Sequence, residues 1–333
     1  MITLKTIIES ALIPHTAFTN VTNKLEQCFR YAEDALEPIG LVIIGESRTG
    51  KSRCLESFML AHPCIRSTEG INIPVFSVKT PAKPTVKGLV ESMLMAIGDP
   101  QFDKGTEQVK THRLRLLMSR CETRMIIIDE FQHFVDKGSS KIAFHVADWL
   151  KMLIDESRVS IVVAGLPSCL DVLRGNEQLA GRFMAPVVLP RFNWLNEDLR
   201  EEFSAILAAF HEQIKQHFDT PNFSTDEMAF RFHCASGGLI GYVAKILRSA
   251  IWMAVDQKRR SISMDDLRIA LDMSVDSAFF KNADLSPFSV GFSIKPTQAC
   301  LEHFAKIGTR AKEAISARSL NRPTKDDSSK GST

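Results

Sequence analysis

The sequence lacks the patterns that several large classes of protein require. Its seven cysteines include no C-x-x-C pair and no histidine at zinc-ligand spacing, so we expect reduced thiols rather than a zinc site or a disulfide framework. The start, Met1-Ile2-Thr3-Leu4-Lys5, has no signal-peptide pattern, and no uncharged run approaches the roughly 18 residues of a membrane span. We find no internal repeat and no coiled-coil heptads. These absences favour a cytoplasmic protein that does not contact a membrane.

Neither sign of charge dominates. The chain has 41 basic and 39 acidic residues, giving a formal net charge of +2, so any contact with nucleic acid has to come from local clusters. Of the 333 residues, 44% are apolar and 24% are charged, which is ordinary for a globular protein with a sizeable core. The length suits one large domain or two smaller ones.

Short apolar runs alternate with helical stretches through the first 190 residues. The expected strands are 40–44, 73–78, 125–129, 159–164 and, more briefly, 187–189. The expected helices are 19–37, 51–60, 86–97, 108–121 and 142–155. Continuous apolar runs of this length are typical of parallel strands covered on both faces. The alternation predicts an α/β fold with a right-handed, mostly parallel sheet.

Beyond Pro190 the pattern becomes almost entirely helical. Amphipathic stretches at 197–217, 225–234, 240–255 and 264–272 predict a small helical lid. From about residue 318 the chain is polar and we expect disorder. We therefore divide the chain into a helical segment (1–38), an α/β nucleotide-binding domain (39–190), a lid (191–275) and a C-terminal extension (276–333).

A phosphate-binding loop stands between the first expected strand and the helix after it. It reads Gly45-Glu46-Ser47-Arg48-Thr49-Gly50-Lys51-Ser52, a complete Walker A motif. In such a loop the glycines let backbone N–H groups wrap the phosphates of ATP, the lysine reaches the β- and γ-phosphates, and the Ser hydroxyl ligates Mg²⁺. The pattern predicts ATP binding by all eight residues, with Ser52 on the metal.

A second acidic motif ends the third expected strand. Met125 to Ile128 is apolar and leads into Asp129-Glu130, the form of a Walker B motif. In this arrangement Asp129 completes the Mg²⁺ shell and Glu130 orients or deprotonates the attacking water. The competing interpretation is a buried strand with a solvated Asp-Glu at its tip.

Walker A, an Asp-Glu Walker B and a helical lid together resemble the AAA+ superfamily rather than kinases or GTPases. That resemblance implies an arginine from the neighbouring subunit, which stabilises charge on the transferring phosphoryl group. Arg182, in the box Leu179-Ala180-Gly181-Arg182-Phe183, stands at the matching place. Arg174 is the alternative, and a surface arginine on a short helix is the competing interpretation of Arg182.

Two positions depart from the superfamily pattern. Residues 164–168, Ala-Gly-Leu-Pro-Ser, follow the fourth expected strand without the usual polar sensor residue. In the lid, Tyr242 stands where an arginine is expected, and Lys245 lies almost one helical turn further on. These departures predict slow turnover, used as a timer, rather than vigorous hydrolysis.

Several details taken together resemble the TnsC/TniB/MuB group of transposition regulators, and most of all TnsC of CRISPR-associated transposons. They are the Gly-Glu-Ser-x-Thr-Gly-Lys-Ser loop, the Gly-Leu-Pro after the fourth strand, the Leu-x-x-Arg-Phe box and the Gly-Gly-Leu-Ile-Gly of the lid, all within residues 13–273. The resemblance implies an ATP- and Mg²⁺-dependent homo-oligomer, a ring or filament of about six or seven subunits per turn around double-stranded DNA. It also implies contacts with a TniQ-type target-selection protein and with transposase subunits.

The same resemblance places DNA contacts on loops that line the pore. Segment 77–87 holds three lysines and two threonines among prolines, and both residue types contact phosphates without reading sequence. Our candidates are Lys83, Thr80, Lys79 and, on the next loop, Lys104; a solvated basic loop is the competing interpretation. The tail after residue 309 resembles a flexible basic segment that docks the transposase, with basic residues Arg310, Lys312, Arg318, Arg322 and Lys325.

Two other functions also fit these motifs. One is a helicase loader or replication initiator of the same superfamily, which also binds DNA as an ATP-dependent oligomer. The other is a nucleotide-switched signalling or secretion-assembly protein that holds ATP without processing DNA, and the missing sensor residues are compatible with it.

Overall fold

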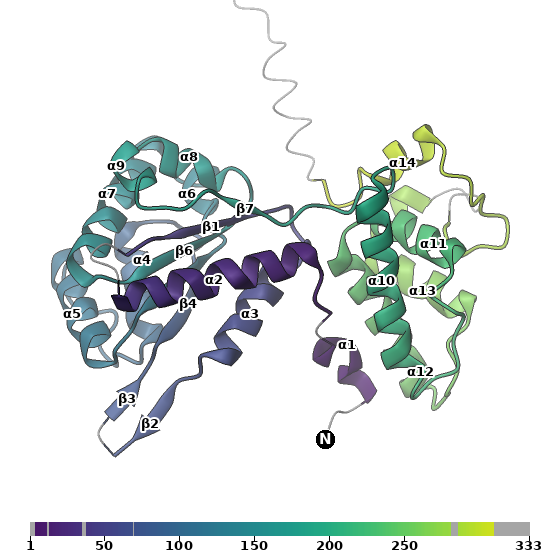
Figure 1. Ribbon diagram of the computed structural model, residues 1–333, viewed down its shortest axis with the longest axis horizontal. Coiled ribbons are helices and arrows are strands. Elements are labelled where there is room, and N and C mark those ends of the chain that lie inside the picture. The colour runs from purple at the N-terminus through teal and green to yellow at the C-terminus, as the bar shows by residue number, and fades with distance from the viewer. Residues whose placement is uncertain (1–3, 12, 35–37, 69, 281–285, 310–333) are drawn as a thin grey trace, which may run out of the picture.

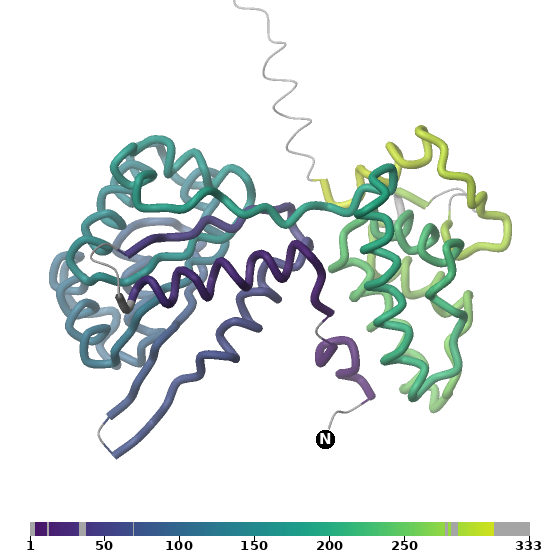
Figure 2. Tube along the Cα trace, in the orientation of Figure 1, coloured from purple at the N-terminus to yellow at the C-terminus, as the bar shows by residue number. Residues whose placement is uncertain are grey.

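We describe the protein from a computed structural model that places residues 4–11, 13–34, 38–68, 70–280 and 286–309. These residues form two lobes, an α/β lobe built on one parallel sheet and a lobe made of helices (Figures 1 and 2). The tail that we expect to be basic and disordered lies outside the described residues.

Five parallel strands form the sheet, in the spatial order β4-β5-β6-β1-β7. Their bounds are Leu41–Ile44 (β1), Val75–Lys79 (β4), Met125–Asp129 (β5), Ser160–Gly165 (β6) and Val187–Val188 (β7). All residues of β1, β5 and β6 are buried, as continuous apolar runs require. The predicted α/β class is confirmed. Strand β4 begins after Pro74 rather than at Ile73, because proline has no N–H to donate to a strand ladder.

The two faces of the sheet are covered by different helices, because successive strand residues point to opposite faces. Leu41 and Ile43 face the core formed with α2 (Thr16–Asp34) and α3 (Lys51–Ala61). Val42 and Ile44 face the second layer. That layer contains α4 (Val86–Ala96), α5 (Glu107–Arg120), α6 (His133–Asp136), α7 (Ser140–Ser157), α8 (Cys169–Arg174) and α9 (Glu177–Ala180).

A short antiparallel hairpin that the sequence pattern does not predict follows α3. Strands β2 (Ile65–Ser67) and β3 (Gly70–Asn72) pair with each other and project from the α/β lobe (Figure 1). Ile65 and Ile71 are exposed, so neither strand carries the buried apolar run by which the other strands are predicted.

The helical lobe packs around its own apolar core. Its main helices are α10 (Glu197–Ile214), α11 (Asp226–Ser236), α12 (Ile240–Asp256) and α13 (Met264–Ser274), which confirm the four predicted helices. Residues after 280 join the same core through Phe288, Phe292 and α14 (Gln298–Phe304). The core of the helical lobe therefore continues past residue 275, where we expect the lid to end. Among the described residues no single helix has the length and hydropathy of a membrane span. Helices α11 and α12, which are joined at a bend, have that length and hydropathy only when they are taken together.

The first residues of the chain belong to the helical lobe rather than to the sheet. The 3-10 turn η1 (Leu4–Thr6) and helix α1 (Ile7–Ser10) contact α12, and Ile7 and Ile8 are buried in the helical core. Trp252 Nε1 donates to the Lys5 carbonyl at 2.8 Å. Helix α2, in contrast, packs on the sheet. The expected segment 1–38 thus spans both lobes (Figure 2).

Candidate nucleotide site

The Walker A loop joins the carboxyl end of β1 to α3. Gly50 has φ +102° at the N-cap of α3, a left-handed conformation that side chains rarely adopt. At Gly45, a Cβ would lie 2.5 Å from the Leu189 carbonyl oxygen, so only glycine fits there. These two positions give the loop the curvature that points backbone N–H groups at a bound phosphate.

Lys51 folds back into this loop. Its Nζ donates to the carbonyls of Gly45 and Glu46, at 2.7 Å each. Burial lowers the pKa of Lys51, and the nearby carboxylates of Asp129 and Glu130 act in the opposite direction. A lysine in this position is a ready donor to phosphate oxygens.

The structure brings Walker A and Walker B together at the end of β5. Ser52 Oγ donates to Asp129 Oδ2 at 3.3 Å, and Asp129 Oδ1 accepts from the Glu130 backbone N–H at 2.8 Å. A hydroxyl and a carboxylate side by side are the hard oxygen ligands that Mg²⁺ takes beside substrate phosphates. The donor set therefore fits a magnesium nucleotide. Glu130 has φ +56°, which is unusual for a residue with a side chain.

Two adjoining cavities lie at this site, each of about 310 Å³. The first is lined by Lys51, Ser52, Glu130 and the turn after β6. The second shares Gly50 and Gly241 with it and has an apolar wall from both lobes: Ile8, Ile13, Phe18, Ile206, Phe210 and Ile240. The first cavity is polar enough for phosphates, and the second suits a flat apolar group such as a nucleotide base.

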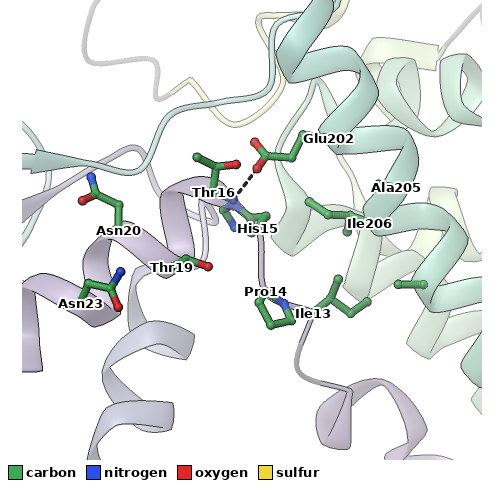
Figure 3. Close-up of a pocket in the computed structure, with 11 residues that line it drawn as sticks. Ile13, Pro14, His15, Thr16, Thr19, Asn20, Asn23, Glu202, Ala205 and Ile206 are labelled. Carbon is green, nitrogen blue, oxygen red and sulfur yellow. Dashed lines mark hydrogen bonds between the residues drawn. The ribbon is translucent and has the colours of Figure 1, made fainter.

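A larger open cleft of about 780 Å³ lies on the other side of the Ile13-Pro14-His15 stretch, between α2 and α10. Figure 3 shows this stretch running beside the helix that carries Glu202, with the backbone N–H of Thr16 bonded to Glu202. None of the Walker residues lines the cleft, so it is not part of the phosphate site.

The lid contacts the Walker A loop directly. The Gly241 backbone N–H donates to the Arg48 carbonyl at 2.9 Å, and the Arg48 guanidinium lies 4.9 Å from the centroid of the Tyr242 ring. Tyr242 therefore contacts the loop by stacking on Arg48. Lys245 Nζ donates to the Ser274 carbonyl at 2.7 Å, which ties it to α13.

Sequence reasoning missed Arg191 and Gln132. Arg191, just after β7, bonds to Glu46 of the Walker A loop, to the Gly237 carbonyl of the lid and to the Ile307 carbonyl. These partners are far from it in sequence, so no local pattern indicates its role. Gln132 is 2% exposed and donates to Glu130. The sequence offers one indication of Gln132: it is a polar residue between Phe131 and Phe134, and both of these pack in the core.

Arg182 lies at the opposite end of β1 from the Walker A loop. Its carbonyl accepts from the backbone N–H of Gly40, which precedes the strand, and its guanidinium pairs with Asp155 at 2.9 Å. The structure therefore does not bring Arg182 to the phosphate cavity of its own subunit. Arg174, the alternative, is exposed at the end of α8.

The proposed DNA contacts divide into exposed and buried groups. Lys79, Lys83 and Lys104 are exposed, and Lys104 pairs with Asp103 at 3.4 Å. Thr80 is 4% exposed, and its hydroxyl donates to the Asp129 carbonyl at 3.1 Å. The expectation that Thr80 contacts DNA is therefore wrong, because its hydroxyl connects β4 to Walker B.

The sheet order, the nucleotide loop and the attached helical lobe define an AAA+ ATPase fold, and solved structures share it. The ORC2 protein of Aeropyrum pernix, solved as ADPNP-ADP complexes, is 16% identical with a TM-score of 0.57, covering 81% of this chain and 71% of that one. CDC6P of Pyrobaculum aerophilum is 11% identical with a TM-score of 0.59, covering 93% and 84%. The Aeropyrum pernix ORC1 protein in complex with DNA is 13% identical with a TM-score of 0.55, covering 84% and 73%.

These identities establish the fold alone. The family described as "Bacterial TniB protein" matches residues 3–194, more than half of the chain. The protein therefore belongs to the TniB family, within the group of transposition proteins that its motifs resemble. Comparison with curated proteins gave no match.

Proposed function

We propose that this protein is an ATPase that regulates DNA transposition, assembling with ATP as a ring or filament on double-stranded DNA. Membership of the TniB family supports the link to transposition. In this role it connects a TniQ-type target-selection protein to transposase subunits, as TnsC-like proteins of CRISPR-associated transposons do in the group it resembles.

One observation carries the proposal: Arg182 and the Walker A loop lie at opposite ends of the same strand, β1. An arginine at that end lies away from the phosphates of its own subunit, which supports a role at the nucleotide of a neighbouring subunit instead. Hydrolysis that needs Arg182 then depends on assembly, because the arginine supplies charge stabilisation in trans. Head-to-tail contacts of this kind close into rings or continue as filaments.

The residues of one subunit divide the chemistry among them. Lys51 and the loop N–H groups bind the β- and γ-phosphates, and Ser52 and Asp129 hold Mg²⁺, which neutralises charge on the phosphates when it is bound. Glu130 orients the attacking water. The cavity formed by residues of α1, α10 and α12 takes the adenine base, so bound ATP contacts both lobes.

Slow turnover fits the lid. Tyr242 stacks on Arg48 and Lys245 is bonded to α13, so each side chain has a partner within the protein. We infer that ATP acts mainly by holding the two lobes in the arrangement that assembles, and that hydrolysis ends that state.

The DNA contacts that remain are Lys79, Lys83 and Lys104. Lys79 ends β4, and Lys83 lies on the turn before α4, so both stand near the end of the sheet that carries the nucleotide loop. Exposed lysines bind phosphates without reading bases, which suits a protein that accepts many targets. The ORC1 structure, solved with DNA, supports DNA binding by this fold.

Filter binding tests this function against the two alternatives. With a non-hydrolysable ATP analogue, we expect nanomolar to micromolar concentrations of the protein to retain duplex DNA of arbitrary sequence. Retention with ADP should be much weaker. A strong preference for single strands would indicate a helicase loader instead. Absence of DNA binding with either nucleotide at low salt would indicate an ATP-dependent assembly protein that does not act on DNA.

A further inference from the structure

A buried amide lies in the wall of the phosphate cavity, at a place that the motifs do not account for. Gln132 follows Walker B by two residues, just before α6, and its side chain is almost completely buried, at 2% exposure. It lines the same cavity as Lys51 and Glu130. A buried polar side chain needs hydrogen-bond partners, and its partners here define what it does.

Both ends of the Gln132 amide are used. Nε2 donates to Glu130 Oε2 at 2.5 Å, so the amide holds the carboxylate proposed to orient water. Oε1 accepts from the backbone N–H of Leu166 at 3.1 Å and from Cys169 Sγ at 3.8 Å. One side chain therefore links Glu130 to the turn that follows β6.

The turn after β6 is shaped around this amide. A Cβ on Gly165 would lie 2.2 Å from Gln132 Oε1 and 2.5 Å from Cys169 Sγ. Gly165 is thus required if the amide is to occupy its present position. This is the stretch in which the sequence lacks a polar sensor residue. The amide reaches the end of β6 from the turn after the neighbouring strand β5 instead.

The backbone of Glu130 explains why a tether is useful. Its φ of +56° is a conformation that costs free energy for a residue with a side chain. The Glu130 side chain is 46% exposed at the edge of the cavity, and hydration by water alone would leave it free to adopt several rotamers. A hydrogen bond from a buried, doubly anchored amide selects one of them.

We propose that Gln132 is the positioning residue of Glu130 and replaces the polar residue that the end of β6 lacks. The proposal rests on the ATPase function above. Because Gln132 is fixed to the Leu166 backbone, any movement of the turn after β6 moves the Glu130 carboxylate as well. The turn leads into α8 and on to α9 and Arg182, so the amide bonds Glu130 to the start of the segment that carries the proposed trans arginine.

Two substitutions separate the two ends of the amide. Gln132→Glu keeps the size and the acceptors for Leu166 but replaces the donor to Glu130 with a second carboxylate. Gln132→Met keeps the approximate volume and removes both bonds. The matched control is Gln178→Met, which alters an exposed glutamine on α9. For each variant we measure three quantities: steady-state ATPase on DNA, affinity for a non-hydrolysable ATP analogue, and affinity for Mg²⁺-ADP–aluminium fluoride.

We expect both Gln132 variants to lose about 100-fold in kcat, as for a misplaced catalytic group, with KM and analogue affinity within about two-fold of wild type. Affinity for Mg²⁺-ADP–aluminium fluoride, which mimics the transferring phosphoryl group, falls in parallel with kcat. Gln178→Met leaves all three unchanged.

Three results would overturn the proposal. Wild-type kcat in Gln132→Met would show that Glu130 needs no donor, and the proposed function would stand. Parallel loss of analogue affinity and thermal stability would make Gln132 a purely structural residue. If wild type neither turns over ATP nor prefers the aluminium fluoride complex to the analogue, the ATPase function fails and the role of Gln132 with it.

Discussion

The guanidinium of Arg191 forms a two-armed ion pair with the Glu46 carboxylate, with Nε–Oε1 at 3.1 Å and Nη2–Oε2 at 2.5 Å. The same guanidinium donates to the carbonyls of Gly237 at 2.6 Å and Ile307 at 3.0 Å. Glu46 is in the Walker A loop, Gly237 ends α11, and Ile307 is among the last described residues. One arginine therefore joins the nucleotide loop, the lid and the C-terminal segment.

Loss of this arginine should uncouple the lid from the nucleotide. We expect Arg191→Ala to lower affinity for an ATP analogue about ten-fold, within the usual range of coupling free energies between sites. It should also lower the free energy of unfolding by about 2 kcal/mol, because buried carbonyls lose their donors. Arg200→Ala, which removes an exposed pair with Glu197 on α10, is the control and should change neither quantity. Unchanged analogue affinity in Arg191→Ala, measured by calorimetry, would contradict the coupling.

A mixing experiment tests the shared site. Arg182→Ala and Glu130→Gln subunits, each inactive alone, should recover measurable ATPase when combined, because some interfaces then join an intact Glu130 to an intact Arg182. The same mixture made with Arg174→Ala in place of Arg182→Ala distinguishes the alternative arginine. If ATPase recovers only in the mixture with Arg174→Ala, or at no ratio in the mixture with Arg182→Ala, then Arg182 is not the trans arginine.

Salt dependence tests the DNA contacts. Lys83→Ala should weaken duplex binding and reduce the slope of log K against log salt by about one, with ATP affinity unchanged. Lys215→Ala, on the helical lobe and paired with Glu212, should leave the slope unchanged. Thr80→Ala should also leave the slope unchanged while costing about 1 kcal/mol of stability, because its hydroxyl bonds to the Asp129 carbonyl. An unaltered slope in Lys83→Ala would move the DNA site elsewhere.

Buried His233 makes the helical lobe sensitive to acid. Burial lowers its pKa from 6.5 to about 4, while Nε2 donates to the Phe192 carbonyl at 3.0 Å. Between about pH 4 and pH 6.5, His233 binds a proton in the unfolded chain but stays neutral in the folded protein. Stability is therefore fully present above about pH 6.5 and falls as the pH drops toward 4, by roughly 3 kcal/mol in all.

Urea unfolding at pH 7 and pH 4.5 measures this loss. His233→Gln should show a shallower fall in unfolding free energy between the two pH values, whatever its stability at pH 7. His217→Gln, at an exposed position, should retain the wild-type slope. An equally steep fall in His233→Gln would assign the acid sensitivity to other groups.

The sequence predicts the parts of this structure that depend on local pattern. The apolar runs of β1 and β5 are read correctly because a parallel strand covered on both faces has to be apolar at every position. The Walker A loop is found because its glycines meet a local need, seen at Gly45 and Gly50. In the same way, Ser52 and Asp129, 77 residues apart, are brought together by a fold that the motifs already imply.

What the sequence does not predict depends on contacts between distant residues. Ile7 and Ile8 join a core formed mostly after residue 190, and nothing in their own neighbourhood shows it. Thr80 is buried because its backbone and hydroxyl both bond to the Asp129 carbonyl of the adjacent strand. Gln132 acquires its role only through the Leu166 backbone, which no residue pattern encodes.

Assembly on DNA tests the central claim most directly, namely that the ATP state of the Walker A loop controls oligomerisation. Electron microscopy and light scattering of wild type, Lys51→Ala and Glu130→Gln on duplex DNA, each with ATP and with ADP, give the result. We predict rings or filaments for wild type with ATP, longer-lived assemblies for Glu130→Gln and none for Lys51→Ala, because Lys51 no longer holds the phosphates. Assembly of Lys51→Ala on DNA to the same extent as wild type would contradict the account.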